Sequence, residues 1–253
     1  MPATPHAPHA LVTGGGRGIG RAIAASLARQ GMTVTVLGRK PAALDEAVAA
    51  GDAHFADVAD VADRAAITAA IARAAERQPI DVLVANAGAA ESAPFTKSDA
   101  ALFARMMDVN FMGVVHSIHA ALPSMRTRPA GRIVAVASTA GLKGYAYVSA
   151  YVAAKHAVVG LVRALALELA NTPITVNAVC PGFTDTDLVA SSIDTIMKKT
   201  GRSREQAVAE FAKHNPQGRL VTPQEVANTV LWLCGAGASA VTGQAIAVAG
   251  GEI

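Results

Sequence analysis

The chain has 253 residues, of which 52% are hydrophobic, and it carries a net charge of +3. It has no apolar run near the ~20 residues of a membrane span, and its start lacks the basic flank and apolar core of a secretory signal. The lysines and arginines form no dense cluster, which argues against nucleic-acid binding. The two cysteines, Cys180 and Cys234, have no disulfide framework and no metal-ligand spacing. Together these features favour a cytoplasmic protein without a metal.

Strand-like and helix-like segments alternate in chain order after a proline-containing tail over residues 1–8, which we expect to be flexible. Strands are predicted at 9–13, 33–37, 53–56, 81–85, 132–137, 174–178 and 244–248. Helices are predicted at 20–30, 41–50, 60–77, 98–121, 150–170 and 223–233. We expect the 174–178 strand to be followed by a break at Cys180-Pro181-Gly182, and residues 183–219 to be irregular or to contain small helices.

Seven strands separated by helices predict an α/β fold with a parallel sheet covered by helices on both faces. The segments at 81–85 and 132–137 are apolar almost throughout, the pattern of strands that are buried on both sides. No linker or repeat interrupts residues 9–253, so we expect one doubly wound domain.

A glycine-rich segment, Thr13-Gly-Gly-Gly-Arg-Gly-Ile-Gly20, lies between the first predicted strand and the first helix. Glycines let a backbone turn tightly and approach a pyrophosphate, and the helix N-terminus stabilises the phosphate charge. A glycine-rich hairpin is the alternative, which the strand before the segment and the helix after it disfavour. The segment therefore predicts a dinucleotide site that includes Gly14, Gly18, Ile19 and Gly20.

The end of the second strand indicates which dinucleotide binds. An acidic residue there would bind the 2′-hydroxyl of NAD, whereas an arginine suits a 2′-phosphate. The strand ends Leu-Gly-Arg-Lys at residues 37–40, with no carboxylate, and Arg17 could reach the same phosphate as Arg39. We therefore expect NADP(H), with NAD(H) as the alternative if Arg39 and Lys40 are merely solvated.

Tyr151 and Lys155 are four residues apart in a predicted helix, so both side chains project from one face. A phenol has a pKa near ~10, and a nearby cation lowers it. Such a tyrosine can give a proton to a carbonyl oxygen or take one from an alcohol. The alternative is a tyrosine that simply packs on a lysine stem.

These motifs, in this order, resemble the short-chain dehydrogenase/reductase family over nearly the whole chain. The shared motifs are Thr13-Gly-x-x-x-Gly-x-Gly20, Asp57-Val58, Asn86-Ala87-Gly88, Asn110, Ser138, Tyr151-x-x-x-Lys155 and Pro181-Gly182. Each motif is weak alone, but the ordered series is specific. The resemblance implies a Rossmann-type fold and an oxidoreductase that interconverts a ketone and a secondary alcohol by NAD(P)(H)-dependent hydride transfer.

The resemblance also implies catalytic roles. Tyr151 would be the general acid and base, and Ser138, at the end of the fifth strand, would hydrogen-bond the substrate oxygen. Lys155 would bind the nicotinamide ribose hydroxyls and lower the pKa of Tyr151. Asn110, a poor former of the helix that contains it, would hold a water that relays protons from Lys155 to solvent.

Further cofactor contacts follow from the same resemblance. Asn86-Ala87-Gly88 would line the cofactor near the adenine ribose. Asp57 would accept a hydrogen bond from the adenine amino group, with Val58 donating its backbone amide; a helix cap is the alternative for Asp57. The backbone after Pro181-Gly182 would meet the nicotinamide carboxamide. The side chain of either Thr184 or Thr186 would add a contact there.

Residues 183–219 are expected to form a lid over the substrate. Basic residues outnumber acidic ones over 191–219: Lys198, Lys199, Arg202, Arg204, Lys213 and Arg219 against Asp194, Glu205 and Glu210. A basic lid could attract a substrate carried by coenzyme A or an acyl-carrier protein, although a solvated amphipathic helix would have the same composition.

The end of the chain narrows the substrate class. Segments 216–227 and 241–251 resemble 3-oxoacyl-thioester reductases and 3-hydroxyacyl-CoA dehydrogenases, and aromatic polyketide ketoreductases look similar. A 3-oxoacyl or 3-hydroxyacyl thioester is therefore favoured over a free small ketone, secondary alcohol or sugar alcohol.

The helices at 98–121 and 150–170 have apolar, alanine-rich faces, which in this family pair across a dimer interface. We expect a homotetramer built from homodimers. A cofactor-binding protein without turnover is a further alternative, against which the intact Ser138, Tyr151 and Lys155 argue.

Overall fold

A seven-stranded parallel sheet forms the centre of the computed structural model, which describes residues 7–253. The strands lie in the order β3-β2-β1-β4-β5-β6-β7, and each neighbouring pair is parallel. The strands are β1 (His9–Thr13), β2 (Thr33–Gly38), β3 (Phe55–Val58), β4 (Val82–Ala85), β5 (Gly131–Val136), β6 (Ile174–Pro181) and β7 (Ala245–Val248). The predicted doubly wound α/β fold is confirmed. Residues 1–6 of the expected flexible tail lie outside the described part of the chain.

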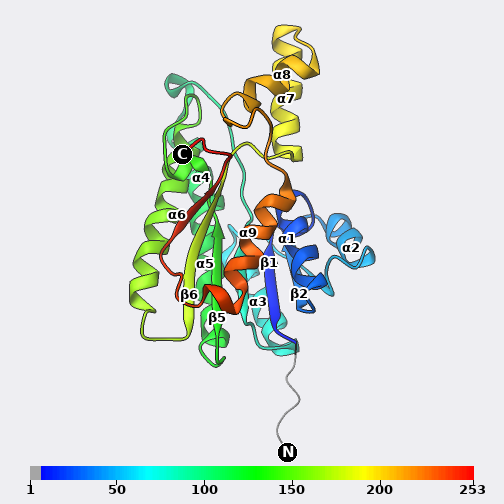
Figure 1. Cartoon of the computed structure of the whole chain (residues 1–253), viewed down its shortest axis with the longest axis vertical. Coiled ribbons are helices and arrows are strands. Elements are labelled where there is room, and N and C mark those ends of the chain that lie inside the picture. The colour runs from blue at the N-terminus through cyan, green and yellow to red at the C-terminus, as the bar shows by residue number, and fades with distance from the viewer. Residues whose placement is uncertain (1–6) are drawn as a thin grey trace, which may run out of the picture.

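Helices cover both faces of this sheet (Figure 1). They are α1 (Gly18–Arg29), α2 (Pro41–Ala49), α3 (Arg64–Arg77), α4 (Ala100–Met107), α5 (Gly113–Met125), α6 (Ser149–Glu168), α7 (Asp187–Thr200), α8 (Arg204–Ala212) and α9 (Pro223–Cys234). Helices α1 and α9 bury Ile23, Leu27, Val226 and Val230 against one face. Helices α3, α5 and α6 pack on the other face through residues such as Ile71, Ile118 and Val158. The sheet therefore has a separate apolar core on each side.

Helix α3 begins at Arg64, four residues later than predicted, because a capping residue fixes its start. The Asp63 carboxylate accepts hydrogen bonds from the amides of Ala65 and Ala66 at 2.9 and 3.0 Å. Asp60, three residues after Asp57, instead holds a turn by accepting from the Ala62 amide at 3.0 Å. The apolar pattern of the sequence begins in this turn, and for that reason the helix was predicted to start too early.

The helix predicted at 98–121 is interrupted. A π-helical turn, Asp108–Met112, separates α4 from α5, and Asn110 lies within this turn. The Asn110 side chain donates to the carbonyl of Met106 at 3.0 Å, a group that a regular helix would pair with a backbone amide. Insertions of this kind are frequent at functional sites. The prediction of one continuous helix was wrong because its apolar pattern continues through the interruption.

Strand β6 also extends further than predicted. It runs to Pro181, whereas we expected the strand to end at residue 178 and the chain to break at Cys180-Pro181-Gly182. Pro181 is the last residue paired with β7, opposite Val248, and the next amide, that of Gly182, donates to the Val248 carbonyl at 3.0 Å. A proline is tolerated at this strand end because the ladder continues from the following residue.

Helices α7 and α8 stand together beyond the carboxyl ends of the strands, at the end of the molecule opposite the start of β1 (Figure 1). They share a small apolar cluster of their own, centred on Val189, Ile193 and Ala207. We predicted irregular structure or small helices here, and α7 is a full 14 residues long.

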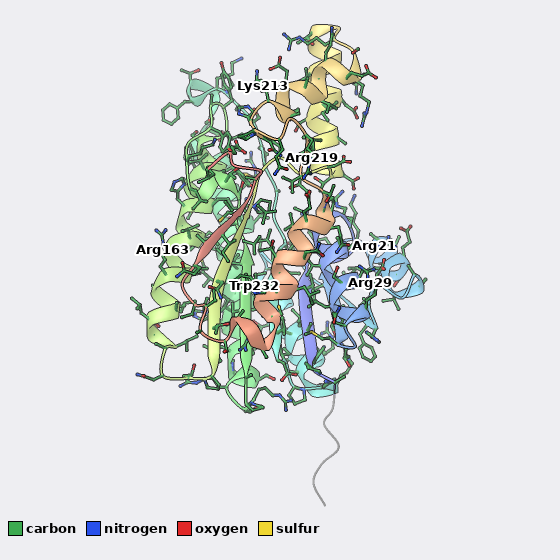
Figure 2. The ribbon with its side chains drawn as sticks, in the orientation of Figure 1. Arg21, Arg29, Arg163, Lys213, Arg219 and Trp232 are labelled. Atoms are coloured by element: carbon green, nitrogen blue, oxygen red, sulfur yellow. The ribbon has the colours of Figure 1, made fainter. Side chains whose placement is uncertain are left out.

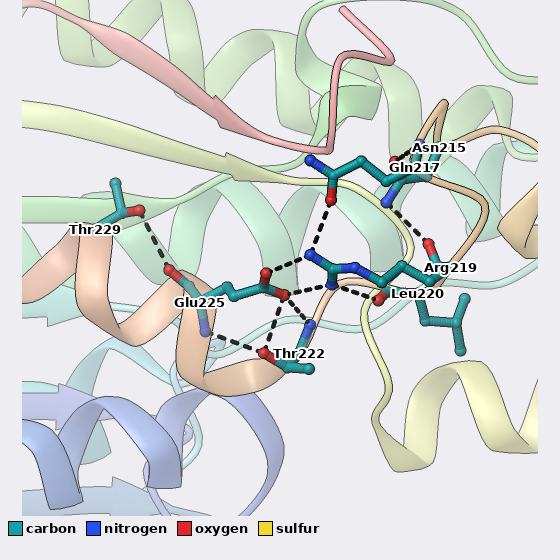
Figure 3. A network of polar contacts seen from close by, with 7 residues as sticks. All are labelled: Asn215, Gln217, Arg219, Leu220, Thr222, Glu225 and Thr229. Atoms are coloured by element: carbon teal, nitrogen blue, oxygen red, sulfur yellow. Dashed lines mark hydrogen bonds and ion pairs between the residues drawn. The ribbon is translucent and has the colours of Figure 1, made fainter.

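The chain enters and leaves the α7–α8 region through two adjacent segments. Thr184 and Val221 form a parallel bridge, in which the Val221 amide donates to the Phe183 carbonyl and the Asp185 amide donates to Val221, both at 2.9 Å. The Arg219 guanidinium then binds the Glu225 carboxylate at 2.6 and 2.8 Å and ties this exit to the first turn of α9 (Figure 3).

Candidate active site

The glycine-rich turn follows β1 and leads into α1. Gly14 and Gly18 have φ angles of 66° and 53°, in the left-handed region that favours glycine. A Cβ atom at Gly20 would lie 2.2 Å from the Gly14 carbonyl oxygen, and one at Gly14 would lie 2.9 Å from the Asn86 side chain. Side chains at these positions would push the turn away from the sheet, so the glycines are required by its close packing.

Thr13 joins this turn to the end of β4, a role that our sequence interpretation missed. Its hydroxyl accepts hydrogen bonds from the amides of Asn86 and Ala87 at 3.0 and 3.1 Å. The Asn86 side chain donates back to the Thr13 carbonyl at 2.9 Å. The predicted Asn86-Ala87-Gly88 segment therefore lies directly beside the glycine-rich turn, where the strand order of the sheet reverses.

The start of α1 suits an anionic pyrophosphate. Arg17 is the N-cap residue, its side chain makes no capping hydrogen bond, and the first turn of α1 contains no acidic residue. The amides around Ile19 therefore keep their donors for a ligand. Arg17 and Arg39 have largely exposed guanidinium groups, which pair with Asp187 at 3.4 Å and with Asp60 at 3.7 Å. Because these pairs are exposed and weak, both arginines remain free to bind a phosphate.

Asp57 is buried and has partners within the chain. Its carboxylate accepts from Arg73 at 3.1 Å and from Arg77, both on α3. The alternative of a helix cap is wrong, because Asp63 caps α3. An adenine contact by Asp57 and the Val58 amide stays a prediction, and in such a contact Asp57 would share its carboxylate with two arginines.

Lys155 lies below the carboxyl ends of the central strands. Its ammonium donates to the carbonyl of Val136, the last residue of β5, at 2.9 Å, and lies 5.7 Å from the centre of the Tyr151 ring. A Cβ at Gly88 would lie 3.6 Å from this ammonium, so Gly88 borders the same space. Burial lowers the pKa of Lys155 to about 8.

Ser138 and Tyr151 come together from the end of β5 and the first turn of α6. The Ser138 hydroxyl accepts from the Ala140 amide at 3.1 Å, which fixes the short turn Thr139–Gly141. Burial raises the pKa of Tyr151, and a hydrogen bond with Ser138 opposes that rise. In the protein alone, the pKa of Tyr151 is therefore raised, whereas we expected Lys155 to lower it.

Asn110 is fully buried beside Gly88 and Lys155. Its side-chain amide donates to the carbonyls of Ala89 and Met106 at 2.9 and 3.0 Å, and its oxygen accepts from the Ala89 amide at 3.1 Å. We expected a water to satisfy this side chain, but the protein backbone does so. A proton-relay water stays a prediction, and the main chain of the π-helical turn would have to hold it.

The segment after β6 lies beside the glycine-rich turn. The Thr184 hydroxyl donates back to the Gly182 carbonyl at 3.0 Å, and the Thr186 hydroxyl donates to the Thr184 carbonyl at 3.3 Å. A Cβ at Gly18 would lie 3.5 Å from the Thr186 methyl group. Thr186 therefore lies against the glycine-rich turn, in a position to contact a ligand bound along it.

Comparisons with known proteins agree with this geometry. The family model for short chain dehydrogenases matches residues 8–197. A putative ketoacyl reductase from Streptomyces coelicolor is 40% identical over 98% of both chains, and a D-beta-hydroxybutyrate dehydrogenase from Cupriavidus necator is 37% identical over 92% of this chain and 93% of its own. A crystal structure of a variant of actinorhodin polyketide ketoreductase with NADPH has a TM-score of 0.93 and 39% identity, covering 99% of this chain and 98% of its own.

The doubly wound sheet, the glycine-rich turn and the group formed by Ser138, Tyr151 and Lys155 define a nucleotide-dependent oxidoreductase. The chain belongs to the short-chain dehydrogenase family. It interconverts ketones and secondary alcohols with an NAD(P)(H) cofactor.

Proposed function

We propose that the protein is an NADPH-dependent ketoreductase that acts on a 3-oxoacyl thioester. The observation that carries this proposal is the grouping of Ser138, Tyr151 and Lys155 at the carboxyl end of β5, where Lys155 binds the Val136 carbonyl and Tyr151 contacts both Lys155 and Ser138. The names of the relatives support the substrate class, since several of them are ketoacyl reductases.

NADPH, when bound, supplies a hydride to the carbonyl carbon of the substrate. Tyr151 donates its proton to the carbonyl oxygen as negative charge develops there, and the Ser138 hydroxyl donates a hydrogen bond to the same oxygen. Ser138 caps a short turn at the end of β5 and Tyr151 lies in the first turn of α6, so both donors are held in place and little reorganisation is needed during the reaction. In the direction of alcohol oxidation, Tyr151 takes the proton back.

Lys155 assists this chemistry by binding the cofactor and by its positive charge. Among the residues that the structure describes, its ammonium has one acceptor, the Val136 carbonyl, so further donor hydrogens remain for the nicotinamide ribose hydroxyls. With a pKa of about 8, the ammonium stays largely charged at neutral pH. The charge favours the phenolate that forms when Tyr151 gives up its proton.

Arg39→Asp is expected to reverse the cofactor preference. The substitution removes a guanidinium partner for the 2′-phosphate and places a carboxylate where a ribose 2′-hydroxyl would bind. We expect kcat/KM for NADPH to fall at least about tenfold and kcat/KM for NADH to fall less or to rise. Steady-state assays with both cofactors measure the ratio. A wild-type kcat/KM for NADH at or above that for NADPH would contradict the NADPH assignment.

The charges of the α7–α8 region give less support to a carrier-bound substrate than the sequence indicated. Arg202 and Lys213 pair with Glu210, and Arg204 pairs with Asp194 at 3.5 Å. The side chain of Lys199 lies outside the described part of the chain. The thioester proposal therefore depends mainly on the relatives and not on a basic surface.

The second candidate is an oxidoreductase of a free small ketone or hydroxy acid. The D-beta-hydroxybutyrate dehydrogenases among the relatives favour it. Assays with acetoacetyl-CoA and with free acetoacetate, each with both cofactors and in both directions, separate the two candidates. We expect kcat/KM to be at least about tenfold higher for the thioester, a difference of ~1.4 kcal/mol in transition-state binding. A preference for free acetoacetate would instead support the second candidate.

Helix α6 supports our proposal that the protein assembles from pairs of subunits in the cytoplasm. By length and composition it could cross a membrane, yet it packs on the sheet, and less than half of it is buried. Leu167 on α6 is 81% exposed, and Trp232 on α9 is half exposed. Figure 2 shows the side chain of Trp232 on α9. We propose a homotetramer in which the α4–α5 and α6 faces pair, and a monomeric mass by light scattering would contradict it.

A further inference from the structure

Glu252, in the turn that follows β7, has a buried carboxylate that none of the sequence motifs includes. Its side chain is only 2% exposed. Oε1 accepts a hydrogen bond from the Tyr145 hydroxyl at 2.6 Å and lies 3.1 Å from the Lys143 ammonium. Oε2 is buried without a hydrogen-bond partner among the described residues. Burying a carboxylate with one oxygen unpartnered is costly, so this position needs an explanation.

The partners of Glu252 belong to the segment that connects the two proton donors of the site. Tyr145 and Lys143 lie between Ser138 and Tyr151. The Tyr145 hydroxyl also accepts from the hydroxyl of Thr139, the residue next to Ser138, at 2.6 Å. The Lys143 ammonium lies 5.2 Å from the centre of the Tyr145 ring and donates to the backbone carbonyl of Glu252 at 3.3 Å. A chain of polar contacts thus leads from Glu252 to the turn that fixes Ser138.

The turn that carries Glu252 contacts two other parts of the site. A Cβ at Gly182 would lie 3.1 Å from Glu252 Oε2, so the carboxylate packs directly on the segment after β6. A Cβ at Gly250 would lie 1.9 Å from the Asn215 side chain, which stands at the base of the α7–α8 region. His214, beside Asn215, approaches Glu252 Oε1 to 4.0 Å. The turn therefore joins the Ser138 segment, the Gly182 segment and the base of α7–α8.

We propose that Glu252 is a positioning residue for carbonyl reduction. It sets the Ser138 segment against the Gly182 segment, so that the donors to the carbonyl oxygen and the wall beside the nicotinamide keep a fixed separation. Hydride and proton transfer depend on such alignment, because a displacement of about 1 Å can cost ~10²-fold in rate. Glu252 itself touches neither the substrate nor the reacting atoms. This inference rests on the proposed ketoreductase function.

Glu252→Ala tests the proposal, with Glu252→Gln as the conservative variant. We expect Glu252→Ala to lower kcat at least about tenfold while KM for NADPH changes less than about twofold, since the cofactor's phosphate contacts are untouched. Glu252→Gln keeps an acceptor for the Tyr145 hydroxyl and is expected to restore most of kcat. Adding Tyr145→Phe to Glu252→Ala should lower kcat little further, because both changes break the same contact.

Hydrogen exchange gives a readout that needs no substrate. In Glu252→Ala we expect faster amide exchange over residues 139–147 and 182–184, with β1 and β4 unchanged. Asp52→Asn, which removes the carboxylate that lies 2.7 Å from Arg21 of α1, is the matched control and should leave kcat and exchange in these segments as in the wild type.

The outcomes separate two failures. Unchanged exchange in Glu252→Ala, or a kcat near that of the wild type together with a lower Tm, would overturn the positioning role. A wild-type chain that reduces no ketone with either cofactor would instead overturn the proposed function, and the exchange result would still decide whether Glu252 fixes the two segments.

Discussion

Tyr151→Phe is expected to lower kcat for ketone reduction at least about a hundredfold, the lower end of what a positioned general acid contributes. The substitution removes only the hydroxyl, which lies with Ser138 and Lys155 in a buried site. Phenylalanine keeps the ring, so the first turn of α6 should pack as before. Following the loss of nicotinamide absorbance gives kcat, and a fluorescence titration gives the Kd of NADPH, which should stay close to the wild-type value.

Tyr147→Phe is the matched control for that experiment. Tyr147 is in the same segment but is 65% exposed, and its removal should leave kcat unchanged. A Tyr151→Phe variant whose kcat stays within about tenfold of the wild type would have lost less than ~1.4 kcal/mol of transition-state stabilisation. The proton would then come from another group, and the mechanism proposed for Tyr151 would be wrong.

Lys155→Met is expected to abolish turnover and yet stabilise the fold. Burial lowers the pKa of Lys155 from 10.5 to about 8, so holding the charged form in the folded state costs roughly 3 kcal/mol at neutral pH. Methionine avoids this cost and fills a similar volume, but it leaves the Val136 carbonyl without its donor, a loss of about 1 kcal/mol. We expect the free energy of unfolding to rise by about 2 kcal/mol near neutral pH.

The stability gained by Lys155→Met is expected to depend on pH in one direction. Between the folded pKa of about 8 and the unfolded value of 10.5, the unfolded chain binds the extra proton, so the wild-type stability contribution of Lys155 rises with pH. The advantage of Lys155→Met should therefore be greatest below about pH 8 and shrink towards pH 10.5. Urea unfolding of both chains across this range measures it. A variant less stable than the wild type at neutral pH would contradict a costly buried charge.

The fold could be predicted from the sequence because its signals are local. The apolar runs that become β4 and β5 are buried on both faces of the sheet. Such strands have no polar face, so they read as continuous apolar segments in the sequence. The glycine-rich turn was equally clear, since the contact of Gly20 with the Gly14 carbonyl excludes any side chain.

Other features depend on contacts that a linear pattern does not contain. The π-helical turn at Asn110 is stabilised by hydrogen bonds to Ala89, which is 21 residues away. Thr13 owes its role to the end of β4, and the Glu252 carboxylate meets Tyr145 across 107 residues. The basic charges near α8 were counted correctly, but their pairing with Glu210 and Asp194 depends on how α7 and α8 pack.

The bridge between Thr184 and Val221 has an evolutionary consequence. Because the two chain segments that flank α7 and α8 are hydrogen-bonded to each other, the ends of the intervening loop are already held together. The closure entropy of a loop grows only slowly with its length, so residues 187–212 can lengthen, shorten or change sequence at little cost to the sheet. Helices α7 and α8 can therefore change in length or sequence between relatives without moving the glycine-rich turn or Tyr151.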